Sequence, residues 1–338
     1  MANGGDHLEN RILLAHGGGG VLTRELIEGL IVPTLGGDPA ALPDAAPVPG
    51  ADGFAITTDA FVVKPLFFRG GDIGSLSVHG TVNDLAVSGA EPLGLAMSLI
   101  LEEGLERANL ERVLASAAEA AKACGIRIVT GDTKVVARGE ADALFITTTG
   151  VGKRLLDLEP GGLREGDRVL LSGGIAEHGV AVMSEREGIE FETEVVSDSA
   201  PVWPLVRALI DAGIEIHAMR DPTRGGLAAS CVELADDAGL TVELDEAAVP
   251  VKPGVRAACE MLGLDPLTVA NEGKLLAFIP ERDAAKALEA LRAIPGGEHA
   301  AIIGTVLART SVSACLRTRY GGQRVVEMPY GEELPRIC

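Results

Sequence analysis

Aromatic residues, basic charge and long apolar runs are all scarce in this sequence of 338 residues. Aromatic side chains make up only 3% of the chain although 47% of it is hydrophobic, so the cores must consist of Ala, Val, Leu and Ile. The net charge of −20 argues against nucleic acid and anionic membranes as partners, because like charges repel. If the ligand is a nucleotide, a protein this acidic needs a bridging cation.

No segment has the uninterrupted apolar length of a membrane span, and residues 1–7 lack the basic and then apolar pattern of a signal peptide. The five cysteines are odd in number and dispersed, without a C-x-x-C pair, which argues against a disulfide framework or a zinc site. We therefore expect a protein of the reducing cytoplasm. Four of the cysteines are interpreted as structural, namely Cys124, Cys231, Cys259 and Cys315.

The common nucleotide-binding signatures are also missing. Gly273-Lys274 is followed by Leu275, so there is no G-x-x-x-x-G-K-[ST] motif. The glycine run Gly17–Gly20 is followed by Val-Leu-Thr, so there is no G-x-G-x-x-G motif either. A run of four glycines alone is a weak signal for a phosphate site.

What the sequence does contain is an interleaving of helical and strand patterns over a length that fits two domains. The patterns do not form strict βαβ repeats, so we predict an α+β fold with two domains. Each domain is expected to hold a mostly antiparallel or mixed sheet covered by helices. The charged, Gly- and Pro-containing residues 152–166 are the best linker, which gives domains at 1–152 and 163–320 and a flexible tail at 328–338.

Hydrophobic periodicity predicts the individual elements. Helices are expected at 22–31, 75–88, 110–125, 177–188, 202–212, 225–238, 254–262 and 283–293. Strands are expected at 54–63, 93–101, 127–130, 143–151, 168–171, 214–218, 241–244, 275–279, 301–306 and 312–318. Gly131–Val135 is expected to connect two of these strands.

The last eleven residues, Met328–Cys338, are predicted to form an irregular, mobile arm. Pro329, Gly331 and Pro335 forbid a regular helix and remove ladder donors. An extended arm of this length reaches roughly 30 Å, far enough to carry the terminal thiol into a distant pocket. The α-carboxylate opposes ionisation of the thiol and Arg336 partly offsets that effect. The alternative interpretation is a frayed terminus with an incidental cysteine.

Acidic residues on turns and strand ends mark the N-terminal half, together with Lys64 and Lys134. These acidic residues are Asp44, Asp52, Asp59, Asp72, Asp84 and Asp132. Carboxylates and a few lysines on glycine-rich turns suit Mg²⁺ with a polyphosphate, because the metal neutralises both. The alternative is ordinary turn chemistry, in which Asp is favoured for local hydrogen bonds.

The C-terminal half offers two short clusters. Arg220–Gly226 ends where a helix begins, so its backbone N–H groups favour an anion, although Asp221 or Thr223 as a helix cap is an equal explanation. Glu272, on the turn Asn271–Lys274, is either a general base or a solvated carboxylate. The histidines His178 and His217 lack partners at ligand spacing and are interpreted as helix or core residues.

Seven segments together resemble the HypE family of hydrogenase maturation factors, and the resemblance runs nearly from end to end. The matching segments are Lys64–Gly74, Gly80–Pro92, Thr130–Val135, His178–Gly188, Asp221–Gly226, Asn271–Lys274 and Pro335–Cys338. The family belongs to the PurM-like superfamily, which is named after aminoimidazole ribonucleotide synthetase. The resemblance implies an N-terminal domain that pairs in a homodimer, a C-terminal α/β domain, and ATP and Mg²⁺ in the cleft between them.

The resemblance also implies a reaction. A HypF-type carbamoyltransferase places a carbamoyl group on the terminal thiol, and ATP-dependent dehydration converts the S-carboxamide to an S-cyanide. The cyanide then passes to iron held by a HypC–HypD scaffold and ends in the [NiFe]-hydrogenase site. An amide oxygen is a poor leaving group, so phosphorylation by ATP, cations on the developing charge and a base near the nitrogen make chemical sense.

Site residues follow from the matched motifs. The resemblance implies that Cys338 carries the substrate, flanked by Glu272 as base and Lys134 as stabiliser. The residues implied for the nucleotide are Asp59, Lys64, Asp84 and Asp132, and those implied for the metal are Asp44, Asp84, Asp132 and Asp221. The sequence departs from the family at Pro43-Asp44, where a paired Asp-Asp is common, and at Gly18, where Ala is common.

Two other functions remain open at this point. The chain is either a PurM-like enzyme that uses ATP on a free small molecule, such as an aminoimidazole ribonucleotide or selenophosphate synthetase, or a scaffold that presents a thiol to maturation partners. The terminal cysteine argues against the first, and the polar motifs in both halves argue against the second.

Overall fold

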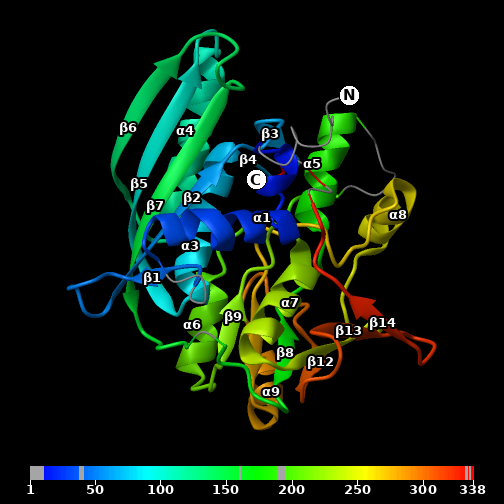
Figure 1. The fold of residues 1–338 in the computed structure, drawn as a ribbon. Coiled ribbons are helices and arrows are strands. Elements are labelled where there is room, and N and C mark those ends of the chain that lie inside the picture. The colour runs from blue at the N-terminus through cyan, green and yellow to red at the C-terminus, as the bar shows by residue number, and fades with distance from the viewer. Residues whose placement is uncertain (1–10, 38–41, 160, 189–194, 332–333, 335) are drawn as a thin grey trace, which may run out of the picture.

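The computed structural model describes residues 11–37, 42–159, 161–188, 195–331, 334 and 336–338. Two large sheets organise these residues, one in each half of the chain. Figure 1 shows the first sheet standing at one side of the molecule and the second sheet below the middle. The carboxyl end of the chain lies between them, beside β3 and α5.

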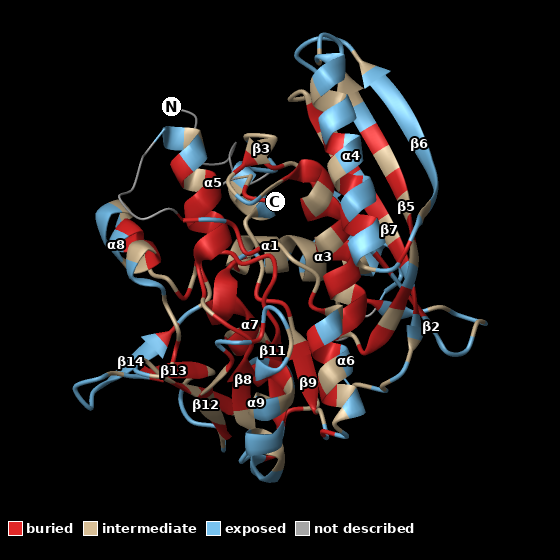
Figure 2. Cartoon of the chain, turned by 180° about the vertical axis from the view of Figure 1, so that it is seen from behind, coloured by how far each residue is buried: buried red, intermediate tan, exposed pale blue. Residues whose placement is uncertain are grey.

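The first sheet has five strands in the order β1-β2-β7-β5-β6, antiparallel except for the parallel pair of β5 and β6. Its strands are β1 (Ala46–Pro47), β2 (Phe54–Phe61), β5 (Ala90–Glu102), β6 (Ile128–Val136) and β7 (Leu144–Arg154). Strand β6 forms one edge and is exposed along nearly its whole length, as the pale blue outer strand of Figure 2 shows.

One face of this sheet is covered by α3 (Ile73–Val87) and α4 (Arg107–Ala123). Inward side chains of the strands and both helices form one core, which includes Phe61, Leu144 and Val113. Helix α3 begins at Asp72, whose carboxylate accepts hydrogen bonds from the first backbone N–H groups of the helix. The opposite face of the sheet has no helix among the described residues, and large apolar side chains are exposed on it.

The second sheet has seven strands in the order β14-β13-β10-β12-β8-β11-β9, antiparallel except for the pair of β10 and β13. Its strands are β8 (Arg168–Leu171), β9 (Ala218–Arg220), β10 (Thr241–Asp245), β11 (Leu276–Ile279), β12 (Ala301–Leu307), β13 (Ala314–Arg317) and β14 (Gln323–Val326).

Helices cover both faces of the central strands of this sheet. In β11, Phe278 packs with α7 (Gly226–Ala238), whereas Ala277 packs with α6 (Trp203–Asp211) and α9 (Ala284–Arg292). Because both faces are buried, β11 and residues 169–171 of β8 are continuous apolar runs instead of alternating ones. Two further helices, α5 (Glu177–Glu187) and α8 (Pro253–Leu262), pack against each other beside the sheet.

Short elements complete the described chain. They are η1 (Leu14–Gly17), α1 (Val21–Leu26), the π-helical segment η2 (Ile27–Ile31), α2 (Val32–Thr34), the hairpin of β3 (Phe67–Phe68) and β4 (Gly71–Asp72), and η3 (Glu281–Asp283). Among the described residues, no helix combines the length and apolar character needed to cross a membrane.

The α+β class predicted from the sequence is confirmed. Two local predictions were wrong. Gly131–Val135 does not connect two strands but lies inside β6, because its backbone pairs with β5. The strand expected at 214–218 begins only at Ala218, where pairing with β11 starts. The hairpin of β3 and β4, together with strands β1 and β14, was not predicted, since two- to four-residue strands carry little periodicity.

Glycine 74 allows α3 to approach α4 closely, because a Cβ atom there would lie 2.2 Å from the carbonyl oxygen of Val113. We expect Gly74→Ala to lower the free energy of unfolding by about 1–3 kcal/mol through overpacking. Gly29→Ala is the matched control, since no atom lies within 4 Å of its added methyl group. Thermal or urea unfolding of both variants checks this, and an unchanged midpoint for Gly74→Ala would contradict it.

Candidate active site

A cavity of about 380 Å³ lies where the two halves of the chain meet. Strand β2 and helix α3 supply one wall, including Asp59 and Asp84. The turn before α7 supplies Asp221 and Arg224, and the turn before β11 supplies Glu272. Cys338, the last residue of the chain, also lines the cavity. Side chains far apart in the sequence therefore face one space.

The end of the arm is bound to the segment that follows β2. The N–H of Val62 donates to a carboxylate oxygen of Cys338 over 3.0 Å, and the N–H of Lys64 donates to the carbonyl of Arg336 over 3.1 Å. The Arg336 side chain donates back to the carbonyl of Val62 over 2.9 Å. The predicted arm is thus docked on its own chain over residues 336–338, so the frayed-terminus interpretation was wrong there.

Helix α5 binds the other side of the same residues. His178 Nε2 lies 2.8 Å from the carbonyl oxygen of Ile337, and Nδ1 lies 2.8 Å from Ser197 Oγ. Since a carbonyl only accepts, Nε2 carries the proton; burial lowers the pKa of His178, so the neutral ring accepts from Ser197 at Nδ1. Arg186 Nη2 donates to the carbonyl of Arg336 over 2.7 Å.

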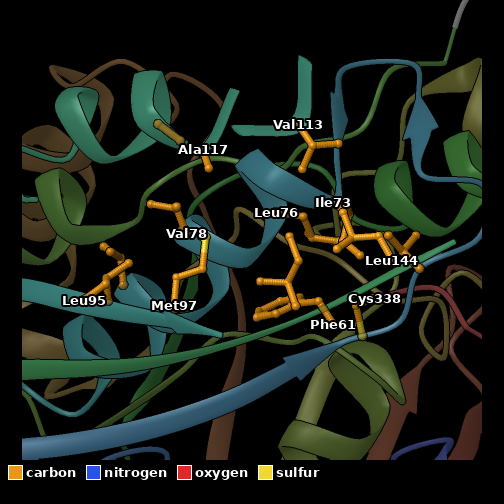
Figure 3. Packing of buried hydrophobic residues seen from close by; sticks show 14 of the residues in the cluster. Phe61, Ile73, Leu76, Val78, Leu95, Met97, Val113, Ala117, Leu144 and Cys338 are labelled. Carbon is orange, nitrogen blue, oxygen red and sulfur yellow. The ribbon is translucent and has the colours of Figure 1, made fainter. Parts of the chain in front are cut away.

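The docked thiol is buried and neutral. Cys338 is 6% exposed and belongs to the same apolar cluster as Phe61 and Leu144, as Figure 3 shows. Its Sγ accepts a hydrogen bond from Arg224 Nη1 over 3.0 Å. Burial raises the pKa of Cys338 to about 12, against the opposing effect of Arg224. Arg336, which the sequence placed beside the thiol charge, is instead paired with Asp142.

The root of the arm is held by the glycine run. The N–H of Val21, at the start of α1, donates to the carbonyl of Pro329 over 2.9 Å. A Cβ atom on Gly20 would lie 2.1 Å from that same carbonyl oxygen. A Cβ atom on Gly19 would lie 2.5 Å from Arg224 Cβ, and the φ angle of Gly19 is +74°. Because these glycines have no side chain, the segments that carry Pro329 and Arg224 can approach the run closely.

Glu272 presents a fixed carboxyl group to the cavity. The side chain is 2% exposed, and Oε1 has no hydrogen-bond partner among the described residues. Burial, reinforced by Asp59 and Asp221, raises the pKa of Glu272 well above its ordinary value. Asn83 of α3 donates to the carbonyl of Glu272 over 3.2 Å and so positions this turn across the two halves.

Three carboxylates form a candidate cation site on the cavity wall. One oxygen each of Asp44, Asp84 and Asp221 lies within 4.8 Å of the other two. Asp221 Oδ2 is buried and has no partner among the described residues. Burial, followed by Asp44, raises the pKa of Asp221 to about 7, although Arg220, which is paired with Asp44, opposes this. Oxygen-only ligands of high charge fit Mg²⁺.

Two family models match the chain, one in each half. The N-terminal domain of the AIR synthase related proteins matches residues 36–153, and their C-terminal domain matches residues 164–316. Carbamoyl dehydratase HypE of Cupriavidus necator is 50% identical over 337 residues, which cover 97% of this chain and 95% of the relative. This chain belongs to the HypE family.

Other relatives named HypE match this chain with similar identity and coverage. The carbamoyl dehydratase HypE of Escherichia coli K12 is 45% identical, with 97% of this chain and 100% of the relative covered. A HypE chain solved in a HypE–HypF complex matches with a TM-score of 0.85 and 42% identity, over 90% of this chain and 99% of that one. HypE solved in complex with ATP matches with a TM-score of 0.82 and 44% identity, over 97% and 100%. The predictions of a PurM-like fold and a HypE-type carbamoyl dehydratase are confirmed.

The cavity gathers some of the predicted site residues and leaves others outside. Those that line it are Asp44, Asp59, Asp84, Asp221, Glu272 and Cys338. Lys134 is paired with Asp132 over 2.6 Å on the exposed strand β6, and Lys64 is paired with Asp142 over 2.8 Å. These three residues, Lys64, Asp132 and Lys134, are not among the described residues that line the cavity, and their roles stay predictions.

Sequence reasoning missed three residues that contact the docked arm. His178 was interpreted as a core histidine, and its partners Ser197 and Ile337 lie 19 and 159 positions away. Arg224 was noted within an anion-favouring turn and within the matched segment Asp221–Gly226, but without a role, although its guanidinium reaches the thiol. Arg186 has no sequence signal beyond lying in a matched motif. Each of the three contacts the docked arm, at Ile337, Cys338 and Arg336 respectively.

The carboxylate cluster predicts how stability depends on pH and cations. Asp221 keeps its proton up to about pH 7 in the folded chain but ionises near its ordinary value of 3.8 when unfolded. The free energy of unfolding should therefore fall as pH rises from about 4 to 7. Mg²⁺ binds the ionised form, so it should raise the melting temperature more at pH 8 than at pH 5.5.

Thermal scans with and without MgCl₂ at the two pH values measure this effect. Asp221→Asn should reduce the pH dependence, of which Asp84 and Glu272 supply the rest, and should lose most of the Mg²⁺ response. Asp211→Asn, an exposed control on α6, should keep both responses unchanged. An equal Mg²⁺ response in Asp221→Asn and the wild type would contradict the assignment of the cluster.

Proposed function

We propose that this chain uses ATP to dehydrate an S-carboxamide on its own Cys338 to an S-cyanide. The observation that carries the proposal is the position of the terminal thiol, which lines the same cavity as Glu272 and the carboxylate cluster. HypE relatives are named carbamoyl dehydratases, and one has been solved with ATP.

The chemistry proceeds in two balanced steps. The carbamoyl oxygen attacks the γ-phosphorus of ATP, ADP leaves, and one N–H proton is lost, which gives an S-bound imidoyl phosphate. The second N–H proton is then removed while the C–O bond breaks, which gives the nitrile and inorganic phosphate. The first step depends on in-line positioning of the phosphate, and the second depends on a base near the nitrogen.

The residues of the cavity fit these steps. Glu272 is assigned as the base, because its carboxyl faces the same space as Cys338 and its raised pKa gives it a high proton affinity. Asp44, Asp84 and Asp221 are assigned to Mg²⁺, which supplies charge neutralisation for the phosphates of ATP when bound. Asp59, on β2 beside this cluster, is assigned to the nucleotide side.

The docked arm also bears on the two other functions. A free small-molecule substrate would have to share the cavity with Cys338, so a small-molecule PurM-like enzyme fits poorly. A scaffold that only presents a thiol has no use for an unpartnered buried Glu272 beside a cation site. Neither alternative has an observation in its favour.

Dehydration can be followed on the arm itself. A protein loaded with an ¹⁸O-labelled carbamoyl group should lose the mass of one water from its C-terminal peptide when ATP and Mg²⁺ are added. The label should appear in inorganic phosphate, since the carbamoyl oxygen leaves with it. Glu272→Gln should load normally but convert about 100- to 10,000-fold more slowly, as expected for a lost general base.

Glu281→Gln, an exposed control in η3, should convert at the wild-type rate. Cys338→Ala should show neither adduct. An adduct that persists in the wild type after ATP is consumed, or ¹⁸O released into water instead of phosphate, would refute the proposed reaction.

We further propose that the chain forms a homodimer through the uncovered face of the first sheet. Phe54, Ile56 and Ile100 are each 39–40% exposed on that face, which is unusual for large apolar side chains in a sheet. Lys134 lies opposite Ile100 in the register of β5 and β6, and Asp132 lies opposite Ser98. Dimerisation would bury this face, so Lys134 is proposed to act within the dimer.

Ile56→Glu should convert the dimer to a monomer in light-scattering chromatography, because it places a charge in the apolar face. Met261→Glu is the matched control, as Met261 is 72% exposed on α8 in the other half. A dimer that survives Ile56→Glu unchanged would contradict the proposed interface.

The remaining partners follow from the chemistry of the arm. A HypF-type carbamoyltransferase is proposed as the carbamoyl donor, in line with the HypE–HypF complex solved for a relative. A HypC–HypD scaffold is proposed to accept the cyanide on iron for the [NiFe]-hydrogenase site. Loss of the cyano adduct when the iron-loaded scaffold is added tests this. The described cysteines are all free, which fits the proposed cytoplasmic location.

A further inference from the structure

Arg224 touches the atom on which the substrate is built. Its Nη1 lies 3.0 Å from Sγ of Cys338, the atom that bears the carbamoyl group in the proposed function. The residue lies in the turn before α7, and its Cβ is packed against Gly19, where a methyl group would lie only 2.5 Å away. The backbone of Arg224 is therefore fixed by the same glycine run that holds the root of the arm.

The other positively charged side chain of the cavity is already paired with a carboxylate. Of the described residues that line the cavity, Arg220 and Arg224 carry positive charge. Arg220 is paired with Asp44 and lies 4.0 Å from Glu233. Arg224, by contrast, has no carboxylate oxygen within 4.0 Å among the described residues, and its one hydrogen bond there goes to sulfur. Its remaining N–H groups are thus available to a stronger acceptor than sulfur.

A carbamoyl group offers that acceptor. Its oxygen lies two bonds from Sγ, and guanidinium presents five N–H donors in a planar fork. Arg224 has only donors, whereas Glu272, in the deprotonated form that its proposed role as base requires, has only acceptors. A planar carbamoyl group between them is therefore held one way round, with its oxygen toward Arg224 and its NH₂ toward Glu272. That orientation places each end of the group where the reaction needs it.

We propose that Arg224 is a catalytic residue, whose guanidinium moves from the thiol sulfur to the carbamoyl oxygen when the arm is loaded. This inference rests on the proposed dehydration. When the C–O bond of the imidoyl phosphate breaks, its electron pair goes to the phosphate oxygen. At the same moment the N–H proton passes to Glu272. The guanidinium neutralises the charge that develops on the leaving phosphate, as a positioned donor does for an oxyanion.

Single-turnover conversion of loaded protein tests the role. The C-terminal peptide is weighed at successive times after ATP and Mg²⁺ are added to wild type, Arg224→Gln, Arg224→Lys and Arg107→Gln. Arg107 is an exposed control on α4, paired only with Glu111 of the same helix. Arg224→Gln should slow conversion about 100- to 1,000-fold. Arg224→Lys, which keeps the charge but loses the fork, should recover part of the rate.

A second measurement separates catalysis from anchoring of the arm. The rate at which a maleimide alkylates unloaded Cys338 reports how often the arm leaves the cavity. Slower conversion in Arg224→Gln with little change in alkylation supports a catalytic role. A loss of conversion that merely parallels faster alkylation, with no recovery in Arg224→Lys, overturns it. Equal conversion in wild type and Arg224→Gln also overturns it, whereas a wild type that does not convert removes the proposed function itself.

Discussion

The hydrogen bonds that dock the carboxyl end of the chain place its thiol in the cavity, and the arrangement of the site depends on that placement. On the arm these bonds end on main-chain oxygens of Arg336, Ile337 and Cys338. The donors are the N–H groups of Val62 and Lys64 and the side chains of His178 and Arg186. These bonds hold the backbone of the arm, and the Cys338 side chain takes part only through the contact of Arg224 with Sγ. A group added to Sγ therefore leaves the main-chain bonds intact. The same main-chain bonds can therefore dock the arm whether or not it is loaded.

Much of the fold follows from periodicity, whereas the site follows from contacts between remote segments. Helix α4 and the largely apolar strands β8 and β11 can be predicted from the sequence. Burial on one or two faces gives each of them a regular pattern of apolar residues. Glu272 and Asp221 were found through family motifs. His178 and Arg224 could not be assigned from sequence, since the partner of each, Ile337 or Cys338, comes near only after both halves and the arm have packed together.

For the carboxylates of the cavity, the requirements of stable folding and of function conflict. Asp84, Asp221 and Glu272 all have raised pKa values, because burial and neighbouring negative charge disfavour their ionised forms. Arg220, paired with Asp44, relieves only part of that repulsion. Electrostatic strain of this kind is characteristic of sites where a cation and an anionic ligand must bind and leave. Asn83 ties the turn that carries Glu272 to helix α3, which carries Asp84, and so holds these two groups in place despite the strain.

The bond between Val21 and Pro329 makes the start of α1 the tether point of the arm. The N–H of Leu22 also donates to the carbonyl of Tyr330 over 3.3 Å. Eight residues, 331–338, lead from there to the thiol, so the thiol can travel at most about 26–29 Å from that point. A tether this short raises the effective concentration of the thiol at its own cavity to about the millimolar range. Any protein that exchanges groups with the thiol must bring its reactive centre inside this radius, so the glycine run that sets the tether point also sets how closely such a protein must dock.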